Sequence, residues 1–257
     1  MGDEPLFPRW DWEDPDGLSA TMDEFTATLA CCEQLDLVAS VLPFSRQDFL
    51  AAGLTGVEFA AFKTKHQSGL GTDLAGLHSD GSATKPGHLY RADGTSHFTQ
   101  MDIAAPLPFG DACVDWVYAE HLIEHVPPAV AKGWLTEVKR ILVPGGLLRL
   151  TTPDLAKYAE SYVNGGGFFA RHRRRLRNMR VGPPMPERKA FMMNQIFYLY
   201  GHRWLYDLDE LRYVLSHAGF DSAAVQVRAF RAGARADIAA LDTTLRSDES
   251  IYVEVTA

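Results

Sequence analysis

Residues 114–146 read VDWVYAEHLIEHVPPAVAKGWLTEVKRILVPGG and contain, in order, a predicted strand and a predicted helix. Val114–Ala119 is almost continuously apolar, which is typical of a parallel strand that is buried on both faces. Ala129–Leu142 carries its apolar side chains at helical spacing, and Pro144 with the two glycines after it ends this helix. Leu147–Thr151 is then the next predicted strand. A strand, a helix and a strand in this order predict a parallel sheet with helices on its faces.

Further predicted strands flank this unit on both sides. They are Val57–Phe62 (as a strand or a buried segment), Thr72–Leu77, His88–Ala92 and Phe98–Ile103 before it, and Val225–Phe230 and Ile251–Val255, as an antiparallel pair, after it. Apolar residues at helical spacing predict a helix within Thr21–Phe49 and a short one over Ser45–Ala52. We therefore expect an α/β fold with a doubly wound, mostly parallel sheet.

The domain organisation is predicted from where these elements begin. Residues 1–70 are expected to form an N-terminal arm with extra helices, and residues 71–257 the α/β domain. A lid over the substrate is expected at residues 160–200, where glycines 165–167 and a Gly-Pro-Pro at 182–184 resemble hinges.

Composition narrows the class of protein. The 257 residues include 25 basic and 33 acidic ones, giving a net charge of −8, and 46% are apolar, as in ordinary globular proteins. The negative net charge argues against a protein that coats nucleic acid. The sequence contains no run of about eighteen apolar residues, so no membrane span is predicted. Three cysteines and an acidic N-terminus without a secretory signal favour a reducing cytoplasm.

Motifs between residues 101 and 149 resemble the class I S-adenosylmethionine-dependent methyltransferases, in their small-molecule branch. The matching residues are Asp102 with Leu107-Pro108-Phe109, then Glu120-His121, then Arg140-Ile141-Leu142-Val143-Pro144-Gly145-Gly146-Leu147-Leu148-Arg149. Gly201–Asp207 and Leu211–Phe220 are similar to a later segment of the same family. The resemblance covers residues 72–257 and implies a Rossmann-like fold that binds S-adenosylmethionine.

The same resemblance implies roles for several polar residues. Asp93 stands for the acid that binds the ribose diol, and Asp102, followed by Ile103, for the acid that reaches the adenine amine. Either aspartate has an alternative role as a helix cap or a turn residue. Glu120 and His121 follow a buried strand, so the switch-point rule places them near the reaction centre.

This sequence differs from the family pattern at the glycine-rich cofactor loop. Counting back from Asp93 places this loop at Leu77–Ser82, where His78 and Asp80 replace glycines and Gly81 remains. Side chains there would fill the space that glycines leave to the cofactor. Gly69–Asp73 is a rival loop with glycines at alternate positions.

Two further groups of residues are candidates for substrate contacts. The segment 171–180 holds six arginines and no acid, so Arg173 and Arg177, together with Arg203, are expected to bind an anionic group. A solvated helical face is the alternative. His202 and Tyr206 are four residues apart and, like His121, are candidate catalytic groups; the alternative is a packing pair. No Cys–His cluster is evident, so no metal is expected.

Three functions remain open on these observations. The first is a small-molecule methyltransferase of secondary metabolism that uses S-adenosylmethionine. The second is an enzyme of the same fold that no longer uses the cofactor and catalyses cyclisation or elimination of a sulfate or phosphate group. The third is a silent subunit of a heteromer. A small, possibly anionic substrate is the expected partner, and a homodimer or heteromer is compatible with the N-terminal extension.

Overall fold

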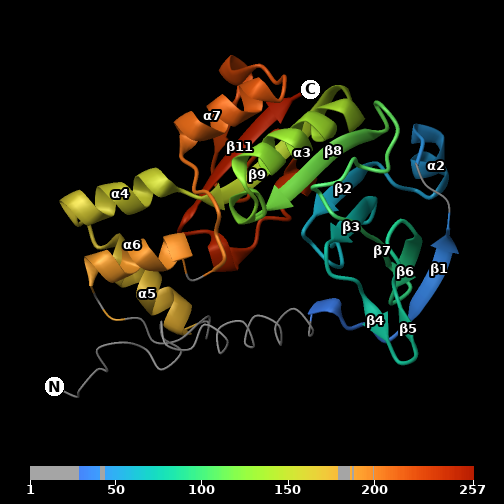
Figure 1. Cartoon of the computed structure of the whole chain (residues 1–257), viewed down its shortest axis with the longest axis horizontal. Helices are drawn as coiled ribbons and strands as arrows, with labels where there is room; N and C mark the ends of the chain where they lie inside the picture. The colour runs from blue at the N-terminus through green and yellow to red at the C-terminus, as the bar shows by residue number, and fades with distance from the viewer. Residues whose placement is uncertain (1–28, 41–43, 179–185, 187, 199) are drawn as a thin grey trace.

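The computed structural model describes residues 29–40, 44–178, 186, 188–198 and 200–257. The strands are β1 (Leu35–Ala39), β2 (Gly56–Phe59), β3 (Gly69–Asp73), β4 (His78–Ser79), β5 (Ser82–Ala83), β6 (Leu89–Ala92), β7 (Ser96–Gln100), β8 (Val114–Glu120), β9 (Leu142–Pro153), β10 (Gln226–Arg228) and β11 (Ser250–Thr256). Nine of them form one sheet in the order β1-β6-β7-β3-β2-β8-β9-β11-β10 (Figure 1). The five strands from β7 to β9 in this order are parallel, and antiparallel strands extend the sheet at both ends.

Helices cover the two faces of this sheet unequally. The helices are α2 (Arg46–Ala51), α3 (Pro128–Ile141), α4 (Leu155–Asn164), α5 (Phe168–Asn178), α6 (Lys189–Tyr198), α7 (Leu208–His217) and α8 (Ala236–Ala239). The main apolar core includes the buried residues of α3 and α7 and the side chains of one sheet face. On the other face Trp116 and Tyr118 pack with Ile238 of the short α8. Helices on both faces were expected, and α8 is the one named helix of the described chain that contributes to this second cluster.

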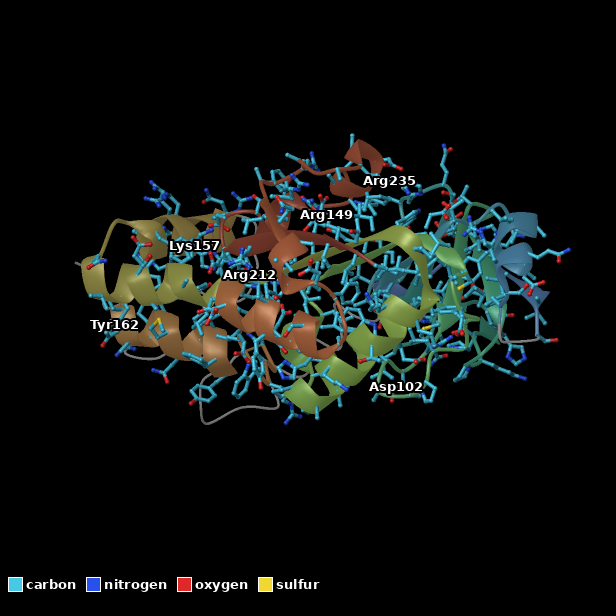
Figure 2. The ribbon with its side chains drawn as sticks, turned by 90° about the horizontal axis from the view of Figure 1, so that it is seen from above. Asp102, Arg149, Lys157, Tyr162, Arg212 and Arg235 are labelled. Atoms are coloured by element: carbon cyan, nitrogen blue, oxygen red, sulfur yellow. The ribbon has the colours of Figure 1, made fainter. Side chains whose placement is uncertain are left out.

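Helices α4, α5 and α6 form a separate layer at one end of the molecule (Figure 1). This helical layer has its own apolar cluster, which includes Tyr158, Phe168 and Ile196. Figure 2 shows Lys157 and Tyr162 of α4 far from Asp102, which follows β7. None of the helices in the described part of the chain is both long and apolar enough to span a bilayer.

Several predicted elements are confirmed. The strand at Val114, the helix after it and the antiparallel pair β10–β11 lie where the sequence predicts them. The short helix α2 is capped by Ser45, whose hydroxyl accepts a hydrogen bond from the backbone N–H of Asp48, while the Asp48 carboxylate accepts one from the Ser45 N–H.

The helix predicted within Thr21–Phe49 is contradicted at residues 35–39, whereas the described residues 29–30 are helical. Residues 35–39 form β1, which pairs with β6, and Leu37 and Val38 stay 57% and 43% exposed. The apolar residues at helical spacing therefore do not share a buried face. Residues 1–28, including the predicted arm, lie outside the described residues.

Strand β3 also begins earlier in the sequence than predicted. β2 and the first residues of β3 precede the expected domain boundary after residue 70, so this boundary would divide the sheet. The strand predicted at Thr72–Leu77 is instead β3, within which Gly71 is required because a Cβ there would lie 2.4 Å from the Phe62 carbonyl oxygen. Gly69–Asp73 is thus a strand and not a glycine loop.

The strand order creates one switch point. From β2 the chain moves outward to β3 and β7, and it then returns to β8 on the other side of β2. Connections leave β2 and β8 in opposite directions, so a crevice is expected outside their carboxyl ends.

Candidate functional site

The loop after β2 stands where the family has its glycine-rich loop. Ala60 and Phe62 have positive φ angles of 54° and 47°, a left-handed backbone that glycine adopts more easily. No helix lies between β2 and β3; the loop turns back over β3, and the Ala61 N–H donates to the Thr72 carbonyl at 3.0 Å. The loop therefore contains left-handed turns, but it provides no helix N-terminus.

Two carboxylates lie at the ends of the neighbouring strands on this side of the switch point. Asp73 ends β3 and accepts a hydrogen bond from the Ala75 N–H at 3.1 Å, and burial raises the pKa of its carboxyl group. Asp102 follows β7, is exposed, and accepts from the Ala104 N–H at 2.8 Å, as a turn aspartate does. Ile103 beside it packs against the main core. Asp73 was not singled out from the sequence, although its place at the end of a strand was a usable signal.

Asp93 does not lie at this edge. It sits in the turn between β6 and β7, and because β6 runs antiparallel to β7, this turn is at the amino end of the parallel strands. Its carboxylate accepts from the N–H groups of Glu33 and Gln34 and pairs with Lys63 at 3.1 Å. The structure therefore does not place Asp93 at the carboxyl ends of the parallel strands, where Asp73 lies.

The residues predicted to form the cofactor loop by counting back from Asp93 also lie elsewhere in the fold. His78 and Asp80 belong to the β4–β5 hairpin, and Gly81, with a φ of 82°, completes its turn. His78 and Asp80 are exposed. The structure places them after the second parallel strand, so they do not replace glycines of a cofactor loop.

Glu120 and His121 end β8 at the switch point, as expected. The Glu120 carboxylate accepts from the Thr243 N–H at 2.9 Å, and burial raises its pKa. His121 has a φ of 51°, its Nε2 lies 2.7 Å from the Ser250 hydroxyl, and its Nδ1 lies 3.0 Å from Glu124 Oε1. Burial lowers the pKa of His121 to about 3, so the ring is neutral at ordinary pH and both its nitrogens face protein groups.

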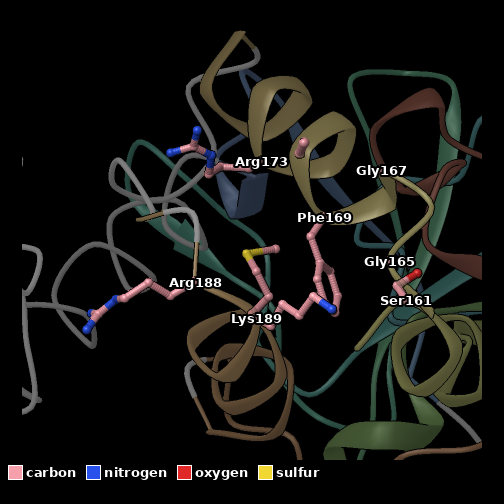
Figure 3. Close-up of a pocket in the computed structure, with 9 residues that line it drawn as sticks. Ser161, Gly165, Gly167, Phe169, Arg173, Arg188 and Lys189 are labelled. Carbon is pink, nitrogen blue, oxygen red and sulfur yellow. The ribbon is translucent and has the colours of Figure 1, made fainter. Parts of the chain in front are cut away.

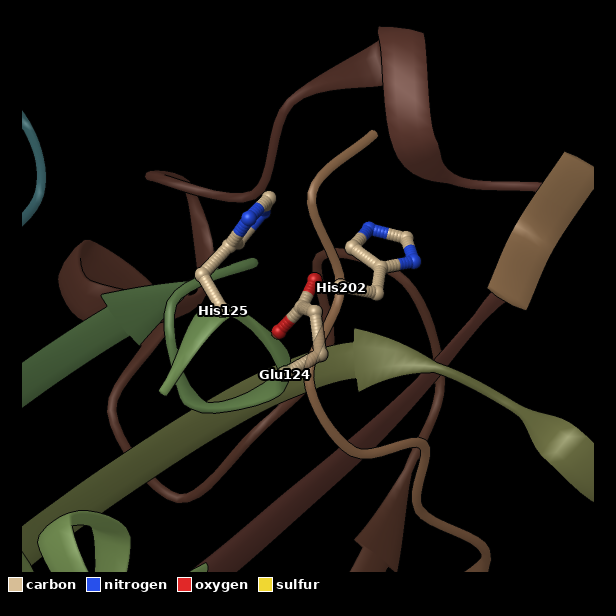
Figure 4. A group of neighbouring side chains, drawn as sticks. All are labelled: Glu124, His125 and His202. Carbon is tan, nitrogen blue, oxygen red and sulfur yellow. The ribbon is translucent and has the colours of Figure 1, made fainter. Parts of the chain in front are cut away.

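A cluster that the sequence did not predict follows directly. The carboxylate of Glu124 points toward the rings of His125 and His202 (Figure 4). The two rings have centroids 4.8 Å apart at an interplanar angle of 74°. Burial lowers the pKa of His125 to about 4 and also lowers that of His202, although His125 as a whole residue keeps an exposed surface. The ring of His125 is therefore neutral at physiological pH.

A second buried network joins the sheet to the helical layer. Tyr158 of α4 donates to Glu249 at 2.7 Å, and its hydroxyl lies 3.2 Å from His172 of α5. His172 in turn lies 3.0 Å from the Asp248 carboxylate. Since Ser250 contacts His121, this network reaches the end of β8 through neighbouring residues of the chain.

The structure separates His202 from Tyr206. His202 lines a cavity of about 390 Å³ together with Arg203, Trp204 and Leu205. Tyr206 is 1% exposed and packs in the main core, where burial raises the pKa of its hydroxyl. The packing role fits Tyr206, whereas His202 reaches a cavity.

The three predicted substrate-binding arginines do not converge. Arg173 lines a cavity of about 160 Å³ in the helical layer, with Arg188 and Lys189 also on its wall (Figure 3). Arg203 lines the larger cavity beside His202, and Arg177 is exposed on α5. The sequence did not identify Arg188 and Lys189, because they lie beyond the arginine-rich segment.

One protein-family model matches part of this chain. Residues 50–150 match the family model described as a methyltransferase domain, and this range includes β2, the switch point and α3. No curated protein matches the chain.

Solved structures of methyltransferases are similar at low identity. An S-adenosylmethionine-dependent methyltransferase from Archaeoglobus fulgidus has a TM-score of 0.41 and 9% identity, over 95% of this chain and 94% of that one. One from Mesorhizobium loti has a TM-score of 0.43 and 14% identity, over 83% and 98% of the two chains. A putative methyltransferase from Haloferax volcanii, in complex with the Trm112 activator, has a TM-score of 0.40 and 15% identity, over 98% and 99%.

Proposed function

We propose that this chain, whose residues 50–150 match the family model of a methyltransferase domain, is a small-molecule methyltransferase that uses S-adenosylmethionine. One observation carries the proposal: Asp73 ends β3 and Asp102 follows the end of β7, and these are neighbouring parallel strands on one side of the switch point. A carboxylate at such a strand end can accept both hydroxyl hydrogens of a ribose diol.

The residues present fit the adenosine half of the cofactor. In this assignment Asp73 accepts the ribose hydroxyls, exposed Asp102 accepts the adenine amine, and Ile103 contributes apolar surface beside the ring. The left-handed loop residues Ala60 and Phe62 lie where the methionine half would pass. When bound, S-adenosylmethionine supplies an electrophilic methyl group.

The substrate is assigned to the cavity of about 390 Å³ that is lined by residues of α4, of α6 and of the segment between α6 and α7. A cavity of this size suits a small molecule. His202 lines this cavity and burial lowers its pKa, and the Arg203 guanidinium offers a partner for an anionic group. His121 is assigned to positioning, because its two nitrogens already face Ser250 and Glu124.

A second candidate is favoured by the altered loop. Without glycines and without a following helix, the segment after β2 gives the cofactor's carboxylate no helix N-terminus. A cofactor-independent enzyme of the same fold would instead use Arg173, Arg188 and Lys189 to hold an anionic leaving group. In either case His78 and Asp80 are not assigned as catalytic bases, since they lie in an exposed hairpin.

Equilibrium titration separates the two candidates. Calorimetric titration of the full chain with S-adenosylmethionine and with its demethylated product is expected to give binding in the micromolar range. Absence of heat and of thermal stabilisation with millimolar cofactor would exclude the methyltransferase and favour the cofactor-independent enzyme.

A further inference from the structure

Glu124, His125 and His202 bring three metal-ligating side chains together, and His202 also lines the larger cavity. Each offers one donor atom, and the three atoms lie within 4.8 Å of one another (Figure 4). Two of the residues belong to the turn after β8, and the third comes from the segment between α6 and α7. The cluster exists only in the folded chain, since its members are far apart in sequence.

Backbone hydrogen bonds fix the two segments against each other. The N–H groups of Arg203 and Trp204 donate to the Glu124 carbonyl oxygen at 2.6 and 3.2 Å. The position of His202 relative to Glu124 is therefore set by the main chain, as in a site that is held ready before a ligand arrives.

The side chains of the cluster are oriented in the way that metal ligands are. His202 Nδ1 lies 2.5 Å from the Ile196 carbonyl, to which it donates, and this leaves the Nε2 lone pair for another partner. A histidine ligand commonly donates its other nitrogen to a carbonyl in this way. Thr152 donates to Glu124 Oε2 at 3.1 Å, and no described residue donates a well-aligned hydrogen bond to the buried Oε1, despite its 3.0 Å distance from His121 Nδ1.

We propose that Glu124, His125 and His202 bind a divalent first-row transition-metal ion, with zinc as the best match. One carboxylate and two imidazoles form a ligand set of zinc sites that keep a fourth position open. Ligand atoms about 2.0–2.2 Å from zinc would lie closer together than the spread seen in the cluster. A rotation of the His125 side chain, which belongs to an exposed residue, would bring the donor atoms closer together.

The open position would face the cavity that His202 and Arg203 line. A hydroxyl, carboxylate or phosphate oxygen of a small molecule in the cavity is the chemical group that would complete the coordination. This assignment of the open position rests on the proposed function, whereas metal binding itself does not. No metal was expected from the sequence, because His202 is remote from the His-x-x-Glu-His pattern of residues 121–125.

Cobalt(II) is the probe for this site, since it substitutes for zinc and absorbs visible light in a tetrahedral or five-coordinate site. Untagged full-length protein, freed of metal with a chelator, is titrated with cobalt(II) in the absence of S-adenosylmethionine. We expect one ion per chain with micromolar affinity, displacement by zinc, and no thiolate-to-cobalt absorption, which would indicate Cys31 or Cys32.

Three variants of the cluster and one control variant locate the site. His202→Ala and His125→Ala are expected to weaken cobalt binding at least tenfold, while His217→Ala, an exposed histidine on α7, leaves binding unchanged. Glu124→Gln keeps the shape of the side chain and should also weaken binding, with circular dichroism confirming that each variant is folded. Equal binding by all variants, a thiolate signal, or no binding at millimolar zinc would overturn the proposal. Because the cofactor is absent, these results are independent of the outcome of the S-adenosylmethionine titration.

Discussion

Two aspartates, Asp73 and Asp93, lie at or directly after the ends of strands of the sheet, and the proposed function assigns a cofactor contact to Asp73 alone. Asp73 and Asp93 are both hydrogen-bonded to backbone N–H groups, but they lie at opposite ends of the parallel strands. The sequence motifs alone do not separate them, because both aspartates follow a short apolar strand. The direction of the preceding strand decides between them, because β3 runs parallel to β7 and β6 runs antiparallel to it.

Asp73→Asn is therefore expected to weaken S-adenosylmethionine binding about 10- to 100-fold, corresponding to the loss of about 1–3 kcal/mol for one partner of a charged hydrogen bond. Asparagine retains an acceptor for the Ala75 N–H, so the turn should persist. Asp93→Asn is the matched control and should leave the affinity unchanged in calorimetric titration. The reverse ranking of the two variants would restore Asp93 to the ribose site.

The free energy of unfolding is expected to depend on pH through the carboxyl group of Glu58. Its carboxyl group is enclosed beside Glu120 and accepts a hydrogen bond from Thr64, and burial raises its pKa from 4.5 to about 7. Between these two values the folded chain holds a proton that the unfolded chain has lost. The contribution of Glu58 to the free energy of unfolding therefore decreases as pH rises through this range.

Glu58→Gln should remove that decrease and stabilise the protein at pH 8, by up to about 3 kcal/mol. Urea unfolding at pH 5 and pH 8 measures the difference. Glu160→Gln, at an exposed position on α4, is the control and should change neither value. A stability difference between Glu58→Gln and the parent that does not vary with pH would contradict the assignment.

At the scale of elements, strands with strong apolar runs were predicted well and glycine-containing ones poorly. β8 is confirmed because Val114–Ala119 is buried on both faces. β3 was placed too late, since Gly69 and Gly71 weaken the strand pattern, and their need for close packing is a tertiary property. The β4–β5 hairpin and the antiparallel β6 lie between β3 and β7, so counting back from a motif selects the wrong strand. The Glu124 cluster depends on long-range contacts that no local pattern encodes.

Arg149 joins β9 to β11 and to the segment after α8. Its guanidinium is fully buried, with the Asp242 carboxylate at 2.5 Å and the Glu254 carboxylate at 2.8 Å. Arg149→Met would leave two buried carboxylates without their cation, and we expect a loss of about 3–5 kcal/mol in the free energy of unfolding. Arg46→Met, which breaks the half-exposed pair with Asp115, should cost less than about 1 kcal/mol. Chemical denaturation of both variants makes the comparison, and similar losses would contradict it.

Helix α5 presents arginines to two different environments. Arg173 lines the smaller cavity with Lys189, whereas Arg177 is exposed. Inorganic sulfate should raise the melting temperature of the parent protein by occupying this cavity, and Arg173→Gln should reduce that rise. Arg177→Gln is the matched control. If sulfate stabilises all three proteins equally, the arginine-rich segment does not form an anion site.

Across the whole molecule, the sheet and the helical layer contact each other through polar groups. The parallel order, the switch point and the antiparallel far edge agree with an α/β fold predicted from the sequence. The helical layer begins at Leu155 and so overlaps the region predicted as a lid, residues 160–200, but its separate apolar cluster could not be predicted from a segment that also carries six arginines. Contacts between the two parts include Tyr158 with Glu249 and His172 with Asp248.

The main apolar core of the sheet and the apolar cluster of the helical layer are joined by hydrogen-bonded acids, which implies limited cooperativity in thermal unfolding. Each core can lose its packing without exposing the other, and the bonds between them contribute less than either core because polar contacts replace contacts with water. Scanning calorimetry should therefore give a measured enthalpy larger than the van't Hoff enthalpy, which is the signature of more than one unfolding unit. A Tyr158→Phe variant, which removes the hydrogen bond to Glu249, should separate the two transitions further. Equal enthalpies in both proteins would mean that the sheet and the helical layer melt as a single thermodynamic unit.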